Sequence, residues 1–288
     1  MEQKKIGFIG TGVMGTGIIQ HLLALPNEIH IFNRTKKKAD SLIENGAFWQ
    51  DSPAHIAQTC QIIFTMVGYP KDVEELYLGK DGLLQHAQEE TIFIDLTTST
   101  PSLAVKLNQS AEELGLFILD APVSGGDVGA KNGTLSIMAG GSEKSFSKVL
   151  PLFKTFGENI VYHGSAGSGQ NTKMSNQIVI ASTMIGVCES LTYAKKAGLS
   201  LDLVLKSIST GAAGSWSLSN LAPRMIDDDF APGFYVKHFI KDLSIALEEA
   251  ERMELKLPGL QLAYSLYNEL SNSGYDDNGT QALIAYYG

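Results

Sequence analysis

The feature that most constrains this chain is a glycine turn set between an apolar strand and an apolar helix near its start. Residues 6–9 read Ile-Gly-Phe-Ile and lead into Gly10-Thr11-Gly12-Val13-Met14-Gly15. Gly10 permits a tight turn, Gly12 leaves room for a pyrophosphate beside the backbone, and Gly15 lets the helix pack closely on the strand. Free N–H groups at the helix N-terminus then point at the phosphates. The pattern predicts a dinucleotide site, rather than a β–α turn that binds nothing.

The second predicted strand, residues 28–32, indicates which dinucleotide is preferred. It ends in Asn33-Arg34-Thr35 and is followed by Lys36-Lys37-Lys38. NAD sites usually place Asp or Glu here, where a carboxylate binds the ribose hydroxyl and would repel a 2′-phosphate. The Arg34 guanidinium can instead stack on adenine and bind phosphate. We therefore expect NADP(H) to be preferred over NAD(H). A solvated basic start to the next helix would explain the lysines but explains Arg34 less well.

The composition limits the kinds of partner that the protein can bind and indicates the cell compartment in which we expect it. A net charge of −9 over 288 residues argues against a nucleic-acid surface. Cys60 and Cys188 are far apart and predict buried free thiols in a reducing cytoplasm, and the six histidines form no metal-ligand pattern. The first strand follows residues 1–5 directly, which predicts no signal peptide. The apolar stretch 178–188 is too short for a bilayer, so we expect no membrane association.

Strands and helices alternate through the first half, which is typical of a mostly parallel, doubly wound sheet with helices on both faces. The predicted strands are 6–9, 29–32, 62–66, 91–95, 117–119, 135–139 and 160–162, and two of the predicted helices are 39–45 and 102–114. The second half is predicted all-helical. One long helix over about 169–196 is followed by helical segments at 201–209, 216–225, 237–252 and 259–272. We expect a Rossmann domain over 1–164 and an all-α domain over 165–288. The apolar circumference of the long helix predicts self-association as a dimer or tetramer.

Candidate substrate-binding residues follow two strands of the first half. Asp95-Leu96-Thr97-Thr98-Ser99-Thr100-Pro101 comes after one strand and Asp120-Ala121-Pro122-Val123-Ser124-Gly125-Gly126 after the next. Ligands of a doubly wound sheet bind beyond the carboxyl ends of its strands. Thr98 and Ser124 can donate hydroxyl hydrogen bonds, and Gly125-Gly126 can offer backbone N–H groups to a carboxylate. Ser99 or Thr100 can alternatively cap the helix that begins near Pro101.

Two lysines in the second half are candidates for chemistry. Lys173 lies near the start of the long helix and shares a face with Gln177, four residues on. Its ammonium can protonate a carbonyl oxygen as hydride reaches the carbon, and a reference pKa of about 10.4 keeps it protonated near neutrality. Lys241 can neutralise a substrate carboxylate or approach the nicotinamide. Asp242 can orient Lys241, or form a surface ion pair of small value.

These motifs, in this order, resemble the β-hydroxyacid dehydrogenase family over nearly the whole chain. The resemblance rests on residues 9–15, residues 120–126, the Gly-x-Gly-x-x-x-Lys element ending at Lys173, and Lys241-Asp242-Leu243. The family includes 3-hydroxyisobutyrate dehydrogenase, tartronate semialdehyde reductase and the glyoxylate/succinic semialdehyde reductases. It implies an oxidoreductase that interconverts a small 3-hydroxy (or 2- or 4-hydroxy) carboxylic acid and its aldehyde or semialdehyde, and the turn at residues 33–35 predicts that it uses NADP(H).

The resemblance also implies a role for each matching residue. Lys173 is implied as general acid/base, and the substrate carboxylate is implied to lie on Ser124, Gly125 and Gly126, beside Thr98 and the aromatic wall of Phe234. The implied cofactor contacts are Gly10, Gly12, Val13, Met14, Asn33, Arg34, Thr35, Met66, Val67, Thr98 and Lys241. No metal is implied.

One position departs from the family pattern. The family usually carries Asn four residues after the lysine, whereas this chain has Asn176 followed by Gln177. Either Gln177 serves with one extra methylene, or Asn176 takes the place of the usual amide. The alternatives to a hydroxyacid dehydrogenase are an imine reductase of the same fold, whose members generally lack the lysine, and a non-catalytic dinucleotide-binding protein.

Overall fold

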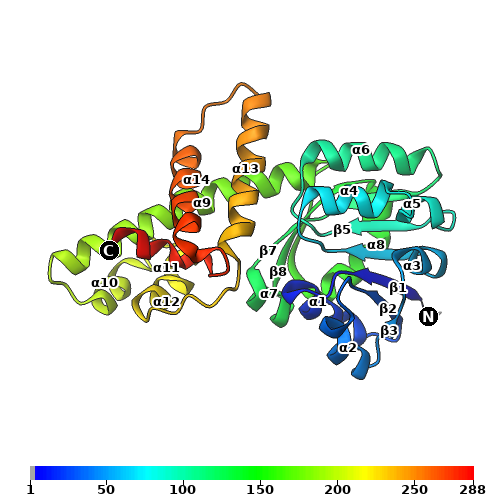
Figure 1. Ribbon diagram of the computed structural model, residues 1–288, viewed down its shortest axis with the longest axis horizontal. Coiled ribbons are helices and arrows are strands. Elements are labelled where there is room, and N and C mark those ends of the chain that lie inside the picture. Colours follow the sequence, from blue (N-terminus) through cyan, green and yellow to red (C-terminus); the bar gives the residue numbers. More distant parts are fainter. Residues whose placement is uncertain (1–3) are drawn as a thin grey trace. The chain divides into compact units, whose positions relative to one another are not determined.

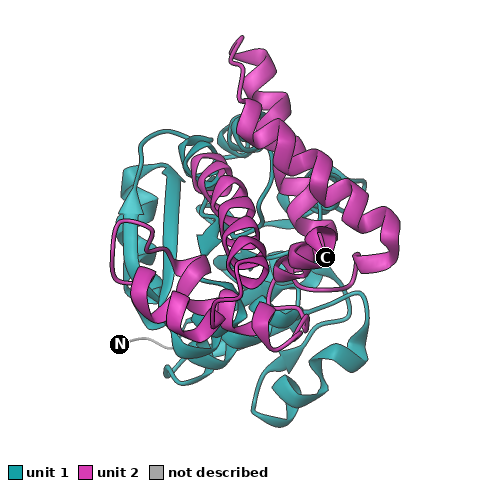
Figure 2. Cartoon of the chain, turned by 90° about the vertical axis from the view of Figure 1, so that its left-hand side faces the viewer, with its two compact units in different colours: residues 1–173 teal, residues 174–288 magenta. Residues whose placement is uncertain are grey.

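A computed structural model describes residues 4–288 of the chain. The expectation of no signal peptide rests partly on residues 1–3, which lie outside the described residues. The chain packs as two compact units, Met1–Lys173 and Met174–Gly288 (Figure 2). The domain boundary expected between residues 164 and 165 stays a prediction.

Within residues 4–173, unit 1 is built on a nine-stranded sheet in the order β3-β2-β1-β4-β5-β6-β8-β7, with β9 paired to β8. Pairing is parallel from β3 through β6, and β8 runs antiparallel to β6 and β7. The strands are β1 (Lys5–Ile9), β2 (Glu28–Phe32), β3 (Phe48–Trp49), β4 (Ile62–Thr65), β5 (Ile92–Asp95), β6 (Phe117–Asp120), β7 (Val123–Ser124), β8 (Leu135–Gly141) and β9 (Gly157–Tyr162). The chain order reverses between β1 and β4, where a doubly wound sheet binds its ligand.

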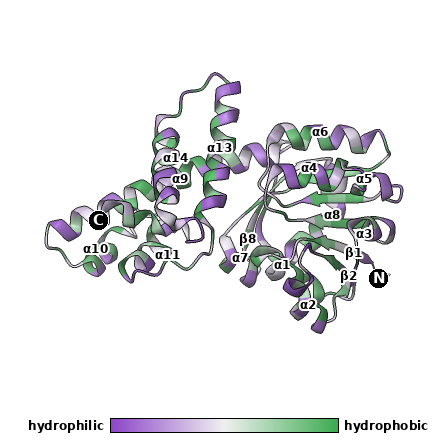
Figure 3. Ribbon diagram, viewed as in Figure 1, coloured by the Kyte–Doolittle hydropathy of each residue, from purple (hydrophilic) through white to green (hydrophobic). Residues whose placement is uncertain are grey.

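Helices cover both faces of this sheet, which confirms the predicted Rossmann class (Figure 1). One group comprises α1 (Val13–Leu23), η1 (Lys36–Ala39), α2 (Asp40–Glu44), α7 (Gly126–Asn132) and α8 (Glu143–Phe156), and the other comprises α3 (Pro53–Thr59), α4 (Pro70–Leu78), α5 (Leu83–His86) and α6 (Pro101–Glu112). Two apolar clusters correspond to the two groups, one around Phe8 and Phe64 and the other around Ile63 and Phe93. Buried on both faces, the parallel strands read as nearly continuous apolar runs (Figure 3).

Unit 2 is helical throughout, as predicted. Its elements are the greater part of α9 (Ser168–Lys196), then α10 (Leu201–Ile208), α11 (Trp216–Asn220), α12 (Ala222–Ile226), α13 (Val236–Arg252), α14 (Pro258–Leu270), the π-helical turn η2 (Ser271–Tyr275) and the 3-10 helix η3 (Thr280–Tyr287). Its core includes Met184, Cys188 and Phe239, and Phe239 packs edge-on against Tyr267 with ring centroids 4.9 Å apart.

Two local features differ from the predictions. The two-residue strands β3 and β7 were not predicted, because two residues show no period. Residues 216–225 form two short helices rather than one segment, because Pro223 occupies the first turn of α12 and begins a new helix. The long helix does run unbroken from Ser168 to Lys196.

Helix α9 is long and apolar enough, by length and composition alone, to cross a membrane, and 44% of its most apolar window is buried within the protein. Core helices of soluble proteins meet the same criterion, so the absence of membrane association stays a prediction. Both cysteines are buried free thiols, as predicted, and burial raises the pKa of each to about 12.

Candidate functional site

The glycine turn after β1 is closed by backbone on two sides and open on the third. Gly10 has φ of 108°, and a Cβ there would lie 2.0 Å from the Met66 carbonyl oxygen. A Cβ on Gly15 would lie 2.0 Å from the Gly10 carbonyl oxygen. A Cβ on Gly12 would meet no described atom within 4 Å. Gly10 and Gly15 are therefore needed for the fold of the turn, while Gly12 keeps its outer side clear.

The start of α1 fits a dinucleotide. Gly12 is its N-cap and brings no side-chain oxygen to cap the first N–H groups. The Thr11 hydroxyl oxygen is buried and has no hydrogen-bond partner among residues 4–288. Val13 in the first turn is 56% exposed. Uncapped donors beside a clear backbone make an anion-binding helix terminus.

Asn33 ties the glycine turn to the end of β2. Its Oδ1 accepts the Thr11 backbone N–H at 3.2 Å, and its Nδ2 donates to the Thr35 carbonyl oxygen at 2.9 Å. Arg34 follows, with its side chain 80% exposed and its Nη1 3.2 Å from Asp72 Oδ1 at the start of α4. The basic side chain at this turn is therefore oriented by a carboxylate from a neighbouring element.

The ends of β1, β4 and β5 are joined by hydrogen bonds. Met66 N–H donates to the Ile9 carbonyl oxygen at 2.9 Å. Val67 N–H donates to Thr97 Oγ1 at 3.0 Å. The predicted cofactor contacts Met66 and Val67 thus lie beside the glycine turn and beside the loop that carries Thr98.

Asp95 anchors the start of that loop from the last position of β5. It is buried, and it accepts hydrogen bonds from Thr65 Oγ1 at 2.9 Å and from the Thr97 backbone N–H at 3.1 Å. Burial, with a smaller contribution from nearby Asp120, raises its pKa to about 6. Half-buried Thr98 follows. Thr100 is the helix cap, because its Oγ1 accepts the Leu103 N–H at 3.1 Å.

Asp120 and Gln170 fasten the first turn of α9 to the sheet. Asp120 accepts the backbone N–H groups of Gly167 and Gln170, each at 2.8 Å. The fully buried Gln170 side chain accepts the Ser99 N–H at 2.9 Å and donates to the Thr97 carbonyl oxygen at 2.7 Å. Despite the backbone donors, burial raises the pKa of Asp120 to about 6. The loop after β5 and the start of α9 are thereby held as one assembly.

This anchoring brings Lys173 to the segment that follows β6. Its side chain is buried, 6% of the residue being exposed, and its Nζ donates to the Val123 carbonyl oxygen at 2.8 Å. Ser124 comes next, and Gly125 and Gly126 have φ values of 132° and 64°, which favour glycine. Unit 1 therefore places the predicted proton donor directly beside the predicted carboxylate-binding loop.

The remaining predicted residues lie in unit 2. Asn176 Nδ2 donates to Gln177 Oε1 and Gln177 Nε2 donates to Asp242 Oδ2, each at 2.7 Å. Lys241 Nζ lies 3.0 Å from Asp242 Oδ1. Asp242 is 1% exposed, so its pair with Lys241 is not a surface ion pair. Separately, the Phe234 ring packs edge-on against Phe239 with centroids 5.7 Å apart.

Sequence reasoning did not single out the anchoring roles of Asp95, Asp120 and Gln170. The available signal was a carboxylate at the last position of an otherwise apolar strand, which marks both Asp95 and Asp120. A buried carboxylate needs hydrogen-bond donors, and its partners are recruited from elsewhere in the chain. Gln170 carried no comparable signal, because its partners lie more than 70 residues away.

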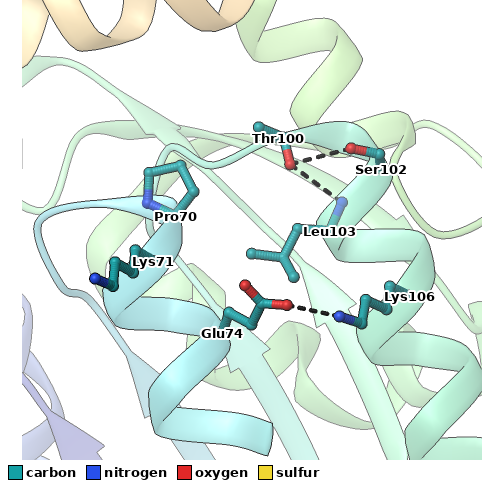
Figure 4. Close-up of a pocket in the computed structure, with 7 residues that line it drawn as sticks. All are labelled: Pro70, Lys71, Glu74, Thr100, Ser102, Leu103 and Lys106. Carbon is teal, nitrogen blue, oxygen red and sulfur yellow. Dashed lines mark hydrogen bonds and ion pairs between the residues drawn. The ribbon is translucent and has the colours of Figure 1, made fainter.

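An open pocket of about 330 Å³ lies between α4 and α6 (Figure 4). It is lined by Pro70, Lys71, Glu74, Thr100, Ser102, Leu103 and Lys106. None of these is a predicted substrate or cofactor residue. Lys106 pairs there with Glu74 at 2.6 Å. The pocket is thus not formed by the predicted cofactor residues of the glycine turn or by the predicted substrate residues beside Lys173.

Comparisons with known proteins cover both units. A family model described as the NAD binding domain of 6-phosphogluconate dehydrogenase matches residues 5–164. A second, described as the NAD-binding domain of NADP-dependent 3-hydroxyisobutyrate dehydrogenase, matches residues 167–287. Together the two models account for nearly the whole described chain.

Individual relatives match over similar lengths. A probable 3-hydroxyisobutyrate dehydrogenase-like protein of Arabidopsis thaliana is 50% identical over 97% of this chain and 84% of its own length. The 2-hydroxy-3-oxopropionate reductase of Escherichia coli is 36% identical over 97% of this chain and 96% of its own. A crystal structure of 3-hydroxyisobutyrate dehydrogenase from Salmonella typhimurium is 25% identical, covers 98% of this chain and 99% of its own, and superposes with a TM-score of 0.90.

Proposed function

Because this chain belongs to the β-hydroxyacid dehydrogenase family, oxidoreductases that act on CH–OH donors, we propose that it interconverts a small hydroxy acid and its aldehyde or semialdehyde with NADP(H). The observation that carries the proposal is the contact of Lys173 Nζ with the Val123 carbonyl oxygen, one residue before Ser124. It sets an ammonium next to a loop suited to a carboxylate.

The substrate carboxylate binds to the Ser124 hydroxyl and to the backbone of Gly125 and Gly126 in this proposal. Positive φ at both glycines supports it, because such a turn can present successive N–H groups to one anion. Thr98 is held at the edge of the same assembly by the bonds that Gln170 makes to its two neighbours. Asn176 and Phe234 complete the proposed substrate contacts.

When bound, the nicotinamide would supply the hydride. Lys173 then donates its proton to the substrate oxygen in reduction and accepts the hydroxyl proton in oxidation. Burial of Lys173, with its Nζ hydrogen-bonded to Val123, limits where the ammonium can lie. A positioned proton donor lowers the barrier because it neutralises the negative charge that develops on the oxygen as hydride reaches the carbon.

Preference for NADP(H) is proposed from the turn after β2. Arg34 is exposed there, and the carboxylate that NAD sites use is replaced by Asn33, whose amide is engaged by Thr11 and Thr35. The other proposed cofactor contacts are Gly10, Gly12, Val13, Met14, Thr35, Met66, Val67, Thr98 and Lys241.

Self-association as a dimer or tetramer is also proposed. Helix α9 exposes 66% of Val179 and 75% of Tyr193, and large apolar side chains on a helix surface favour burial against another chain. Light scattering of the purified protein would test this, since a monomeric mass would contradict it. A cytoplasmic location and the lack of nucleic-acid and membrane partners stay predictions.

The test of the proposed function combines binding and turnover. NADPH and NADH are titrated by fluorescence, and glyoxylate, succinic semialdehyde, methylmalonate semialdehyde and tartronate semialdehyde are then added while nicotinamide absorbance is followed. The expected result is tighter binding of NADPH and its oxidation by at least one aldehyde. Binding without oxidation by any of the four would overturn the proposed substrate class.

A further inference from the structure

Gln177 uses both ends of its side-chain amide inside unit 2. Its Oε1 accepts from Asn176 Nδ2 and its Nε2 donates to Asp242 Oδ2, both at 2.7 Å. The residue is 1% exposed. The orientation of the amide is fixed by chemistry, because an ionised carboxylate only accepts hydrogen bonds and so must face the nitrogen.

The position of the Asp242 carboxylate depends on its hydrogen bond from Gln177. Its Oδ1 is buried and has no hydrogen-bond partner among residues 4–288, although it forms an ion pair with Lys241 Nζ at 3.0 Å. The Gln177 amide is therefore the hydrogen-bond donor that holds the Asp242 side chain in place. A buried carboxylate that loses such a donor is left with an unsatisfied oxygen and is no longer held in one orientation.

We propose that Gln177 is a positioning residue for Lys241 and not a substrate ligand. The amide fixes the Asp242 carboxylate, and the carboxylate fixes the Lys241 ammonium, whose side chain is 12% exposed. The inference rests on the proposed function only in taking Lys241 to contact the cofactor.

The length of the Gln177 side chain suits the hydrogen bond that it makes. Gln177 reaches from α9 to a residue of α13, and an asparagine there would withdraw the amide by about 1 Å or more, which breaks a 2.7 Å hydrogen bond. The longer side chain of Gln177 thus allows a hydrogen bond between α9 and α13.

The test is a double-mutant cycle read by NADPH binding, which requires no turnover. We expect Gln177→Asn to weaken NADPH about three- to tenfold in the wild-type background, and less than about twofold when Lys241→Met is already present. The exposed Gln261→Asn on α14 is the matched control and should leave NADPH affinity unchanged. An equal loss in both backgrounds, or a loss confined to the substrate KM, would overturn the proposal.

A second arm of the test lengthens residue 242 by one methylene to compensate for the shorter side chain at residue 177. Asp242→Glu in the Gln177→Asn background should recover part of the lost NADPH affinity, and no recovery would count against the proposed link. If Gln177→Asn does not fold, Gln177→Met keeps the length without the amide and replaces it in the cycle with Lys241→Met.

A third arm needs neither cofactor nor substrate. Urea unfolding of Gln177→Asn, Asp242→Asn and the double variant should be non-additive, and additivity would overturn the proposed bond. If the variants show this coupling but the wild-type protein reduces no aldehyde, the proposed function is overturned and the positioning role of Gln177 is kept.

Discussion

Asp120 accepts the backbone N–H of Gln170 at 2.8 Å, so a carboxylate at the end of β6 holds the first turn of the helix that carries Lys173. The Gln170 side chain continues the connection to Thr97 and Ser99. Positions far apart in the chain are thereby fixed by one buried polar network. Such a network is costly when only part of it is satisfied.

The first prediction concerns Gln170. Replacing it with Ala removes the partners of the Ser99 N–H and the Thr97 carbonyl oxygen, and a buried polar group without a partner costs about 1–3 kcal/mol. We expect the free energy of unfolding in urea to fall by roughly 2–5 kcal/mol. Exposed Gln109→Ala on α6 is the control. Unfolding of Gln170→Ala at the wild-type urea concentration would contradict the assignment.

The second prediction is a pH dependence of stability. Asp95 has its pKa raised to about 6, chiefly by burial, above the usual 3.8. Between about pH 4 and pH 6 the folded state therefore holds a proton that the unfolded chain has released. The free energy of unfolding contributed by this group must fall as pH rises through that window, and the loss is complete above it.

The measurement is the pH slope of the unfolding free energy in the wild type and in Asp95→Asn. In the wild type, Asp95 should make the free energy of unfolding fall by up to about 1.4 kcal/mol per pH unit as the pH rises, and Asp95→Asn should not show this fall. Asp81→Asn, at an exposed position, should keep it. Identical slopes in wild type and Asp95→Asn would show that Asp95 does not titrate in this window.

The third prediction separates two glycines of one turn. Gly15→Ala puts a Cβ 2.0 Å from the Gly10 carbonyl oxygen, whereas Gly12→Ala meets no described atom within 4 Å. Gly15→Ala should lower the free energy of unfolding by roughly 2 kcal/mol or more and also abolish NADPH binding. Gly12→Ala should unfold like wild type yet bind NADPH at least about tenfold more weakly. Unchanged affinity in Gly12→Ala would place the phosphates elsewhere.

The fourth prediction concerns cofactor preference. Arg34→Ala should weaken NADPH about tenfold or more and NADH by less than about twofold, because only NADPH carries the 2′-phosphate. Lys37→Ala, in the same exposed basic run, is the control. Equal weakening of both cofactors would leave stacking on adenine, and not phosphate binding, as the contribution of Arg34.

The fifth prediction concerns Lys173. Lys173→Ala should lower kcat about 100- to 10,000-fold, which is the usual contribution of a general acid, while NADPH affinity stays close to wild type. Lys106→Ala is the control. It removes an exposed lysine of α6 that pairs with Glu74 of α4, and it should keep wild-type kcat. If Lys173→Ala retains most of kcat, the proton comes from another group.

Local patterns in the sequence were sufficient to predict the framework. The glycine turn, the apolar strands and the unbroken pattern of residues 169–196 each reflect a periodicity within one element. Rossmann topology then follows from alternation and the handedness of crossovers. Thr100 was one of two candidate caps, and only the structure shows that its hydroxyl, not that of Ser99, accepts the helix N–H.

Long-range polar pairing could not be predicted in the same way. The partners of Asp120 are backbone groups of residues 167 and 170, and the partner of Gln177 is 65 residues further along. Neither relationship leaves a period in the sequence. Both arise because buried polar atoms must find partners once packing has placed them.

The two parts of the dinucleotide site differ in how freely they can evolve. Backbone atoms enclose Gly10 and Gly15, so any side chain acquired at either position collides with the main chain. The Arg34 side chain, by contrast, is 80% exposed and pairs with Asp72. Residue 34 can therefore change over evolutionary time without a clash in the fold, and the proposed preference for one nicotinamide cofactor can change with it. Positions 10 and 15 must keep glycine for the turn to form.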